Sequence, residues 1–378
     1  MSAAEVLVLV GTRPEVIKLG PVIEALAQSA SGLRPWTVAT GQHRDLVAPL
    51  ARELGIRIDE DLALGQPGQK PLELHVRLLD ALGPYFRQRR PAAVIVQGDT
   101  GSAFTGALAA FHEGIPVGHV EAGLRTENSR NPFPEEMNRR LITRLADFHF
   151  AATERNARAL RDEGVPDASV VVTGNPVVDA VRRARDETRP SDGLRSLLER
   201  VGTRRLLVLT THRRESFGCV MAGRLEVLSR FVVAHPEIVL VFPVHPNPEV
   251  EASAERGFAD VPGVLRVPPL AYTDFVHLLD RAWLVVSDSG GVQEEAPSLG
   301  KPVLVIRENT ERPEAVEAGV ARLVGNAPEA LERELEACIA DPAWVDRVRA
   351  VANPFGDGKS GARIARALAG FLAEREPT

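Results

Sequence analysis

Short runs rich in valine, leucine and isoleucine alternate along this chain with longer stretches of helical periodicity. The alternation is typical of βαβ units, in which helices join parallel strands and cover the sheet. Because the rhythm starts again after a charged helical stretch at residues 182–200, the sequence predicts an α/β fold with two doubly wound, Rossmann-like domains. The predicted strands are 6–10, 36–39, 93–96, 117–120, 148–151 and 170–173 in the first half, and 206–210, 239–243, 284–287 and 302–306 in the second.

The chain is long enough for two hydrophobic cores, since 44% of its 378 residues are hydrophobic and 25% are charged. The turn at Gly174, Asn175 and Pro176 marks the predicted domain boundary. We therefore expect a first domain over residues 1–174 and a second over residues 175–360.

Charge and cysteine content narrow the function classes. A net charge of −6 offers no general attraction for nucleic acid or anionic membranes, so any phosphate must be bound by locally placed cations and helix ends. The two cysteines, Cys219 and Cys338, indicate neither a disulfide framework nor a zinc site. With no secretory leader and no apolar run of about 18 residues, we expect a soluble, cytoplasmic protein with a small-molecule partner, no nucleic acid and no membrane.

Polar residues follow the predicted strands of both halves. Ligands of such folds bind at the carboxyl ends of strands, so we expect one cleft between the domains. Arg13 follows the first strand, and its planar guanidinium suits a diphosphate. Asp99 and Glu121 end two strands between small residues, and paired carboxylates in a cleft can serve as general acid and base. Glu135, which opens a helix after Pro134, is a third candidate.

The nine histidines divide by position. His212 and His245 each follow a strand directly, among loop residues, which favours a binding role. No histidines are paired at metal-ligand spacing, so we predict no metal. Five others fall within helical or strand patterns and are interpreted as structural: His75, His112, His149, His235 and His277.

The stretch SDSGGVQEEAPSLGKPVLV at residues 287–305 places small residues between a strand and a helix. Backbone N–H groups and the helix dipole favour a phosphate at such a turn, and Ser289, Gly290 and Gly291 are predicted to supply them. The same pattern predicts Glu294 and Glu295 in the first helical turn.

Other familiar signatures are incomplete. No GxGxxG follows the first strand, which argues against a nicotinamide or flavin site. Gly358-Lys359-Ser360 resembles the end of a P-loop, but Asn353 stands in place of its first glycine. Ser289 lacks the first glycine of a nucleophile elbow, because Ser287 occupies that position.

Eleven motifs, in order from Gly11 to Gly358, resemble those of the bacterial non-hydrolysing UDP-N-acetylglucosamine 2-epimerases. The resemblance covers nearly the whole chain and implies a glycosyltransferase-B-like fold with an inter-domain active site and a homodimer. It also implies that a C-terminal helix, at about residues 361–378, packs back on the first domain. The motifs are GTRPEVIKLGP, GQHR, QGDT, GHVEAGLRT, PFPEEMNR, TGNPVVD, THRRESFG, PVHPNP, SDSGGVQEEAPSLGKPVLV, ERPEAVEAG and NPFGDG.

The reaction implied by the resemblance is the reversible conversion of UDP-N-acetylglucosamine (UDP-GlcNAc) to UDP-N-acetylmannosamine (UDP-ManNAc), which supplies ManNAc for cell-surface polysaccharide. Carbon 2 of the sugar has no adjacent carbonyl, so elimination of UDP through a glycal avoids a costly carbanion, and no cofactor is needed. The resemblance implies that Glu295 accepts hydrogen bonds from the ribose hydroxyls. Helix geometry places Glu294 about 100° around the helix from Glu295, where it is interpreted as compensating the helix dipole. By motif matching, the implied catalytic residues are Asp99, Glu121, Glu135 and His212, and the implied UDP-binding residues are Arg13, His245, Ser289, Gly290, Gly291, Glu295 and Arg312.

Three positions depart from the family pattern. Gln97 stands where a histidine is common, Gly101 replaces a threonine, and Ala48-Pro49 replace an acidic–amide pair. The last change argues against a feature that the resemblance also implies, activation by a second substrate molecule. The residues matching that allosteric site are Gln42, His43 and Gln69.

Several alternatives stay open at this stage. A related 2-epimerase of a modified UDP-sugar, such as a diacetamido-uronic acid, and a hydrolysing epimerase fit many of the same motifs. A glycosyltransferase would leave the three carboxylates Asp99, Glu121 and Glu135 without a purpose. From another class, a non-catalytic nucleotide-sugar sensor would keep its function after each carboxylate was replaced by its amide.

Overall fold

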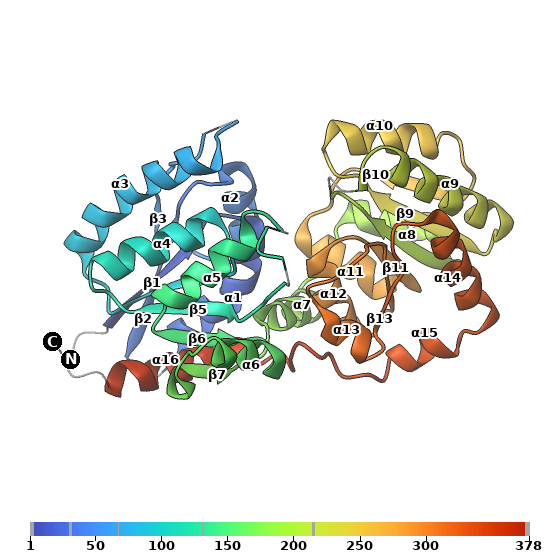
Figure 1. The fold of residues 1–378 in the computed structure, drawn as a ribbon. Helices are drawn as coiled ribbons and strands as arrows, with labels where there is room; N and C mark the ends of the chain where they lie inside the picture. Colours follow the sequence, from blue (N-terminus) through green and yellow to red (C-terminus); the bar gives the residue numbers. More distant parts are fainter. Residues whose placement is uncertain are drawn as a thin grey trace. The chain divides into compact units, whose positions relative to one another are not determined.

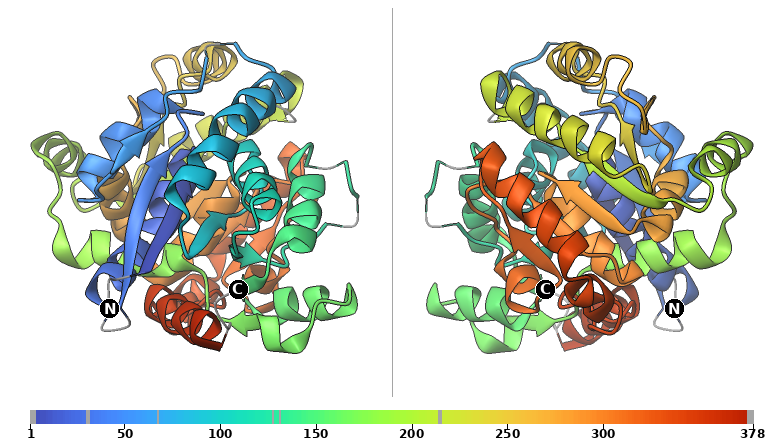
Figure 2. Two further views of the ribbon diagram at one scale, coloured as in Figure 1. Left: turned by 90° about the vertical axis from the view of Figure 1, so that its left-hand side faces the viewer. Right: turned by 90° about the vertical axis from the view of Figure 1, so that its right-hand side faces the viewer.

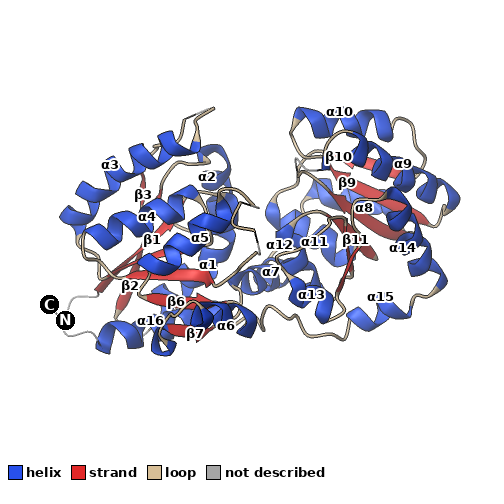
Figure 3. Ribbon diagram, viewed as in Figure 1, coloured by secondary structure: helices blue, strands red, loops and turns tan. Residues whose placement is uncertain are grey.

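The computed structural model describes residues 4–29, 32–66, 68–126, 128–130, 132–213 and 216–374. Arg214 and Glu215 of the THRRE loop lie outside the described residues, as does Asn131 before Glu135. The chain forms two compact units, Met1–Ala180 with Phe355–Thr378 and Val181–Pro354. Each unit holds a parallel sheet flanked by helices, so the predicted doubly wound α/β fold is confirmed (Figures 1 and 3).

The N-terminal unit contains a seven-stranded sheet in the order β3-β2-β1-β4-β5-β6-β7, with every neighbouring pair parallel. The interior strand β1 is buried on both faces, since residues 6–10 are at most 1% exposed, as its continuous apolar run requires. The strands are β1 (Ala4–Val10), β2 (Leu33–Ala39), β3 (Glu60–Asp61), β4 (Ala93–Gln97), β5 (Val117–Ala122), β6 (Phe148–Ala151) and β7 (Val170–Val172).

Helices complete the N-terminal unit. They are α1 (Arg13–Gln28), α2 (Arg44–Glu53), α3 (Pro71–Arg89), α4 (Gly101–His112), α5 (Glu135–Leu145), α6 (Glu154–Asp162) and the C-terminal α16 (Ser360–Glu374), with the 3₁₀ turn η1 (Asp167–Ser169) and α7 (Pro176–Glu187), within which the two units divide.

The C-terminal helix α16 packs against α1 and β6 of this unit (Figures 1 and 2). Only a glycine fits at position 361, because a Cβ atom there would lie 2.4 Å from the carbonyl oxygen of Pro21. The first amides of α16 donate to the carboxylate of Asp179, Ser360 N at 3.2 Å and Gly361 N at 3.0 Å. A protein carboxylate therefore occupies the position where the incomplete P-loop signature would have placed a phosphate.

The C-terminal unit contains a six-stranded sheet in the order β10-β9-β8-β11-β12-β13, again with all neighbouring pairs parallel. Its strands are β8 (Arg205–Thr210), β9 (Ile238–Pro243), β10 (Val264–Val267), β11 (Leu284–Ser287), β12 (Val303–Val305) and β13 (Ala321–Leu323). Its helices are α8 (Asp192–Val201), α9 (Cys219–Ala234), α10 (Pro248–Gly257), α11 (Tyr272–Arg281), α12 (Gly290–Glu295), η3 (Ala296–Leu299), α13 (Pro313–Glu317), α14 (Pro328–Ala340) and α15 (Ala343–Val348).

Two differences from the predicted elements concern the sheets and the linking helix. The strands β3, β10 and β13 were not predicted, and all three lie at sheet edges. The charged stretch at residues 182–200 is not one helix, because α7 ends at Glu187 and α8 begins at Asp192, with Ser191 accepting a hydrogen bond from Leu194 N as its N-cap.

Candidate active site

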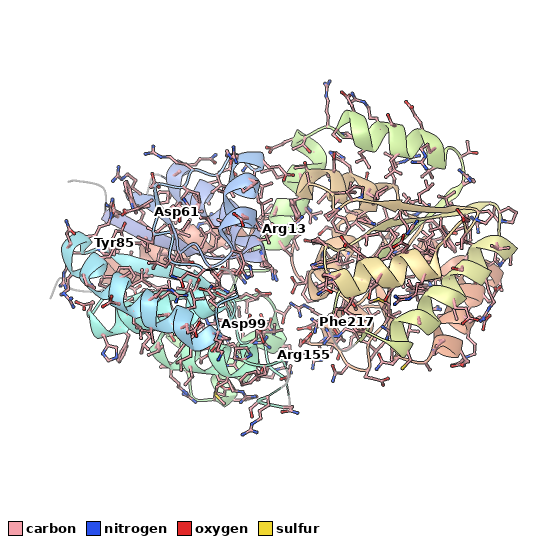
Figure 4. All side chains as sticks on the ribbon, turned by 90° about the horizontal axis from the view of Figure 1, so that it is seen from above. Arg13, Asp61, Tyr85, Asp99, Arg155 and Phe217 are labelled. Carbon is pink, nitrogen blue, oxygen red and sulfur yellow. The ribbon has the colours of Figure 1, made fainter. Side chains whose placement is uncertain are left out.

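A pocket of about 790 Å³ lies at the carboxyl ends of the N-terminal sheet. Figure 4 shows Arg13 and Asp99 at the same end of this unit and Tyr85 at the other. The pocket gathers two of the predicted catalytic carboxylates and all three residues that match the family's allosteric site: Asp99, Glu135, Gln42, His43 and Gln69.

Asp99 is held firmly on its loop between β4 and α4. Its carboxylate accepts hydrogen bonds from Nε (3.0 Å) and Nη2 of Arg139, a buried arginine on α5. Its carbonyl oxygen accepts a hydrogen bond from Nδ2 of Asn138 at 2.9 Å. The preceding residue, Gly98, is held as well, because its carbonyl oxygen lies 2.7 Å from Nε2 of His119. Both the backbone and the carboxylate of Asp99 are thus positioned before any substrate binds.

His119 is completely buried on β5, and burial lowers its pKa to about 3. The ring is therefore neutral at physiological pH, and its Nε2–H donates to Gly98. A neutral ring in this position supports the loop without adding charge beside Asp99.

Glu121, the third predicted carboxylate, is more deeply buried than its position after a strand suggested, with 8% exposed. Its Oε1 lies 2.6 Å from Nζ of Lys18 and 3.2 Å from Nδ2 of Asn175, and its Oε2 accepts a hydrogen bond from Gln97 Nε2. Its φ angle of 64° is unusual for a residue with a side chain, and the register of β5 with β6 shifts here. The bulge turns the side chain toward Lys18 and away from the regular strand direction.

Glu135 is the first residue of α5, as predicted, and lines the pocket half-buried. Its neighbour Glu136 has a different task, because it is fully buried and binds Arg139 at 3.0 Å and Arg140 at 2.7 Å. Glu136 therefore supports the same arginine that holds Asp99, a role that the sequence did not indicate.

The glutamines that match the allosteric site form hydrogen bonds within the protein. Oε1 of Gln42 accepts from Ser102, with N at 3.1 Å and Oγ at 2.7 Å, while Oε1 of Gln69 accepts from Arg77 and from Gln66 N. His43 is exposed at the N-cap of α2. His75, interpreted as structural, contacts Phe104 in a T-shaped geometry and also lines the pocket.

Arg13 and Glu15 share the first turn of α1. Arg13 is half-buried and makes no side-chain hydrogen bond or ion pair with the described residues, so its guanidinium is available for an anion. Glu15 is completely buried, and this burial raises its pKa to about 6. No sequence signal marked Glu15 as more than a helix-start residue.

In the C-terminal unit, His212 follows β8 and lies near a buried carboxylate, Asp288. Nδ1 of His212 lies 3.4 Å from Oδ1 of Asp288, and the His212 and His245 rings stack with centroids 5.4 Å apart. Desolvation lowers the pKa of His212, although 41% of its side chain stays exposed, and Asp288 opposes that shift. Asp288 also accepts hydrogen bonds from Thr211 Oγ1 and from the amide of Arg213.

The SDSGG turn begins the six-residue helix α12 with Ser289 as its N-cap. The prediction that Glu294 and Glu295 lie in its first turn was wrong, because they are its last two residues. Helical side chains point toward the N-terminus, and Oε1 of Glu295 would lie 3.9 Å from a Cβ atom on Gly291. Glu295 is thus beside the turn despite its place at the helix end.

Arg312 supplies a positive charge at this turn. A Cβ atom on Gly290 would lie 2.6 Å from its Nη1, so the guanidinium packs directly on the backbone there. Arg312 is held by Glu294, at 2.8 Å, and by Glu311, at 3.2 Å. The expectation that Glu294 compensates the dipole at the start of the helix was therefore wrong, since it forms a nearly buried ion pair with Arg312.

Within the described ranges, no three histidine, cysteine, aspartate or glutamate side chains converge in a way that could hold a metal ion. No helix in the described part of the chain is long and apolar enough to cross a membrane. Cys219 and Cys338 are both free thiols.

Comparison with known proteins agrees with this arrangement. The family model of UDP-N-acetylglucosamine 2-epimerase matches residues 25–369. The UDP-N-acetylglucosamine 2-epimerase of Escherichia coli strain K12 is 42% identical over 369 residues, which cover 96% of this chain and 98% of that one. The enzyme of the same name from Bacillus subtilis strain 168 is 38% identical, with 97% and 96% covered. The crystal structure of UDP-GlcNAc 2-epimerase from Neisseria meningitidis bound to UDP-GlcNAc has a TM-score of 0.90 at 36% identity and covers 96% of this chain and 99% of its own.

Two doubly wound α/β units with polar residues at the carboxyl ends of their strands define a two-domain epimerase of the glycosyltransferase-B-like type. The family match and the sequence identity over nearly the full length narrow the class of enzyme further. The chain belongs to the UDP-N-acetylglucosamine 2-epimerase family. That the residues of the two units form one inter-domain cleft stays a prediction.

Proposed function

We propose that this enzyme interconverts UDP-GlcNAc and UDP-ManNAc by elimination and re-addition of UDP. The observation that carries the proposal is the pocket that Asp99 and Glu135 share, with Asp99 already held by Arg139. The Neisseria relative, a structure of the same family, was crystallised bound to UDP-GlcNAc. Two carboxylates in one pocket suit a reaction that removes a proton and later returns one.

The proposed chemistry keeps the carbon framework intact. A carboxylate takes the proton from carbon 2, the C–H electron pair forms the carbon 1–carbon 2 double bond, and UDP leaves with the electron pair of the carbon 1–oxygen bond. The glycal then receives a proton on its other face, and a phosphate oxygen of UDP attacks carbon 1. Asp99, Glu121 and Glu135 are the proposed acid/base groups.

The leaving diphosphate needs preorganised positive partners. We assign this role to Arg13, whose guanidinium has no partner in the described residues, and to the turn at Ser289, Gly290 and Gly291 beside Arg312. His212 and His245 would contact the phosphate and the sugar, and Glu295 would accept hydrogen bonds from the ribose hydroxyls. None of these groups requires a redox cofactor.

The test is proton NMR of UDP-GlcNAc incubated with the protein in heavy water. The proposal expects UDP-ManNAc with deuterium at carbon 2 and no free sugar. Release of free N-acetylmannosamine and UDP would instead identify a hydrolysing epimerase. If UDP-GlcNAc stays unchanged but a UDP-diacetamido-uronic acid is epimerised, the substrate is a modified UDP-sugar.

Two further properties belong to the same proposal. We propose that the enzyme works in the cytoplasm and supplies ManNAc for cell-surface polysaccharide, which loss of ManNAc from the polysaccharide of a deletion strain would test. We also propose a homodimer. Exposed apolar side chains on α3, α4 and α5 support it, where α4 contacts both of the other helices: Leu72, Val76, Leu79, Phe111, Met137 and Leu141.

A further inference from the structure

Glu15 joins two loops that are far apart in the sequence. Its Oε2 accepts hydrogen bonds from Gly11 N (2.9 Å), Thr12 N (2.6 Å) and Thr12 Oγ1 (2.8 Å), all in the loop after β1. Its Oε1 accepts from Thr100 Oγ1 at 2.7 Å, a residue 85 positions away in the loop after β4. One carboxylate therefore connects the loop that leads to Arg13 with the loop that carries Asp99.

A helix cap explains only half of this arrangement. A glutamate in the first turn that accepts the N-cap amide forms a capping box, and one oxygen at the protein surface is enough for it. Glu73 does this at the start of α3, where it accepts from Lys70 N at 3.0 Å and stays exposed. Glu15 differs in being 0% exposed and in using its second oxygen on Thr100.

The burial of Glu15 is costly, so the contacts that it makes must offset this cost. All four of its hydrogen-bond donors are neutral groups, and desolvation raises its pKa to about 6. A neutral glutamine would cap α1 without a buried charge. What a glutamine could not do is accept from both loops at once, because one end of its amide is a donor.

Thr100 carries the connection to Asp99, which directly precedes it. Its hydroxyl donates to Glu15 and accepts from Ala103 N at 3.0 Å as the N-cap of α4, so both of its functions are used. Arg139 fixes the carboxylate of Asp99 from α5, but the loop itself is tied to α1 through Thr100 and Glu15. Movement of Thr100 would therefore displace Asp99 relative to Arg13.

We propose that Glu15 is a positioning residue that holds the Asp99 loop in register with the Arg13 loop, and that it does so through Thr100. Glu15 itself is fully buried, so it acts without touching substrate. The proposal rests on the proposed function in assigning Asp99 to proton transfer and Arg13 to the diphosphate. Small displacements of a catalytic group reduce turnover strongly, by about 10²-fold for 1 Å.

The first test compares Glu15→Gln with Glu73→Gln, the capping glutamate that makes no link to a second loop. We expect Glu15→Gln to lower kcat for UDP-GlcNAc by about 10- to 100-fold with KM changed much less, and Glu73→Gln to match the wild type. Equal kcat values for Glu15→Gln and wild type would overturn the proposal. If Glu15→Gln does not fold, Thr100→Val removes the same bond from the other side, and Thr100→Ser, which keeps the hydroxyl, should restore kcat.

A double-mutant cycle shows whether the two residues act as one unit. If Glu15 works through Thr100, the Glu15→Gln/Thr100→Val double variant loses no more kcat than the more severe single variant. Additive losses would mean that Glu15 acts by another route and would contradict the proposal.

A readout without substrate separates this proposal from the proposed function. Hydrogen exchange of the unliganded protein should be faster at the amides of residues 98–103 in Glu15→Gln than in wild type, with no such change in Glu73→Gln. A wild-type protein that leaves UDP-GlcNAc unchanged would refute the proposed function but would leave this measurement decisive. Unchanged exchange at these amides would refute the positioning role, whatever the substrate.

Discussion

The ammonium group of Lys18 lies 2.6 Å from Oε1 of Glu121, and both side chains are at most 8% exposed. Each charge depends on the other in this buried setting, because an unpaired buried charge costs several kcal/mol. Lys18 extends from α1 and Glu121 from the bulge of β5, so the pair connects a helix to the sheet that it covers.

The first prediction concerns this pair. Lys18→Met or Glu121→Gln alone should lower the free energy of unfolding by about 3 kcal/mol, because each removes one charge of a buried ion pair and keeps the other buried. The Lys18→Met/Glu121→Gln double variant should regain most of that stability while staying inactive, since Glu121 is a proposed acid/base group. Urea unfolding and the NMR assay measure the two effects. Stability losses that simply add in the double variant would show that the ion pair is not the source.

The second prediction is a pH dependence of stability that originates at Glu15. Its pKa in the folded protein, about 6, lies above the ordinary value of 4.5. Between these values the folded state keeps the proton and the unfolded state releases it, so this group lowers the free energy of unfolding as pH rises. The change is about 2 kcal/mol, and it is complete above pH 6.

Urea unfolding at several pH values tests this sign. The stability of wild type relative to Glu15→Gln should fall between pH 4.5 and 6 and then level off. His119 provides the opposite case, because its pKa is lowered to about 3. The stability that its neutral ring provides is present above pH 6.5 and is lost as pH falls, so wild type relative to His119→Gln should weaken toward acid. Parallel curves for wild type and Glu15→Gln would contradict the first expectation.

How far the sequence predicts this fold depends on where each strand lies in its sheet. Interior strands such as β1 and β11 are buried on both faces, so their continuous apolar runs were recognisable. Of the edge strands, β7 was predicted, but β3, β10 and β13 were not. β3 is only Glu60–Asp61. In β10 the half-buried apolar residues are interrupted by the exposed Arg266, so neither strand shows the continuous apolar run of an interior strand. Their strand conformation comes from pairing with β2 and β9.

The same distinction applies to the site. Asp99 and Glu135 were predicted because each stands beside a strand end or a helix start, a local pattern. Glu15 and Asp288 were missed as supports because their partners are 85 and up to 77 positions away. The proximity of those partners is a property of the folded sheet, and no local spacing indicates it.

The third prediction concerns Gly101, which replaces a threonine of the family pattern and lines the pocket. A Cβ atom there would lie 3.4 Å from His75 Cε1 and 3.8 Å from Gln42 Oε1, which are ordinary contacts. Gly101→Ala should therefore fold well and gain about 0.5 kcal/mol at the start of α4. Because it narrows the pocket, KM for UDP-GlcNAc should rise a few-fold. An unchanged KM would show that the substrate does not reach this part of the pocket.

The fourth prediction separates the roles of Asp288. Removing its charge in Asp288→Asn should lower the pKa of His212 further, since Asp288 is the group that opposes desolvation there, while His245 and Arg213 act in the other direction. The asparagine amide would also place an N–H donor against the donor groups from which Asp288 accepts, which should lower the free energy of unfolding by about 1–3 kcal/mol. NMR titration of the His212 ring measures the shift.

A matched control for this variant is Asp274→Asn. Asp274 is likewise buried and accepts from Ser191 N at 2.9 Å and Ser191 Oγ at 2.6 Å. Asp274→Asn should lower the free energy of unfolding by a similar amount without changing the pKa of His212. A His212 pKa that shifts equally in both variants would trace the effect to general loosening of the unit.

The last prediction concerns oligomeric state. On α3, Leu72, Val76 and Leu79 follow helical spacing and are 73%, 60% and 39% exposed, so they form an apolar stripe on the outer side of the helix. The neighbouring helices α4 and α5 expose Phe111 and Met137. Light scattering should give the mass of a dimer for wild type and of a monomer for Val76→Asp. Val233→Asp on α9 introduces the same charge at a site that is 59% exposed in the other unit, and it should stay dimeric. A monomeric wild type, or dissociation by both variants, would mean that this stripe is not the dimer contact.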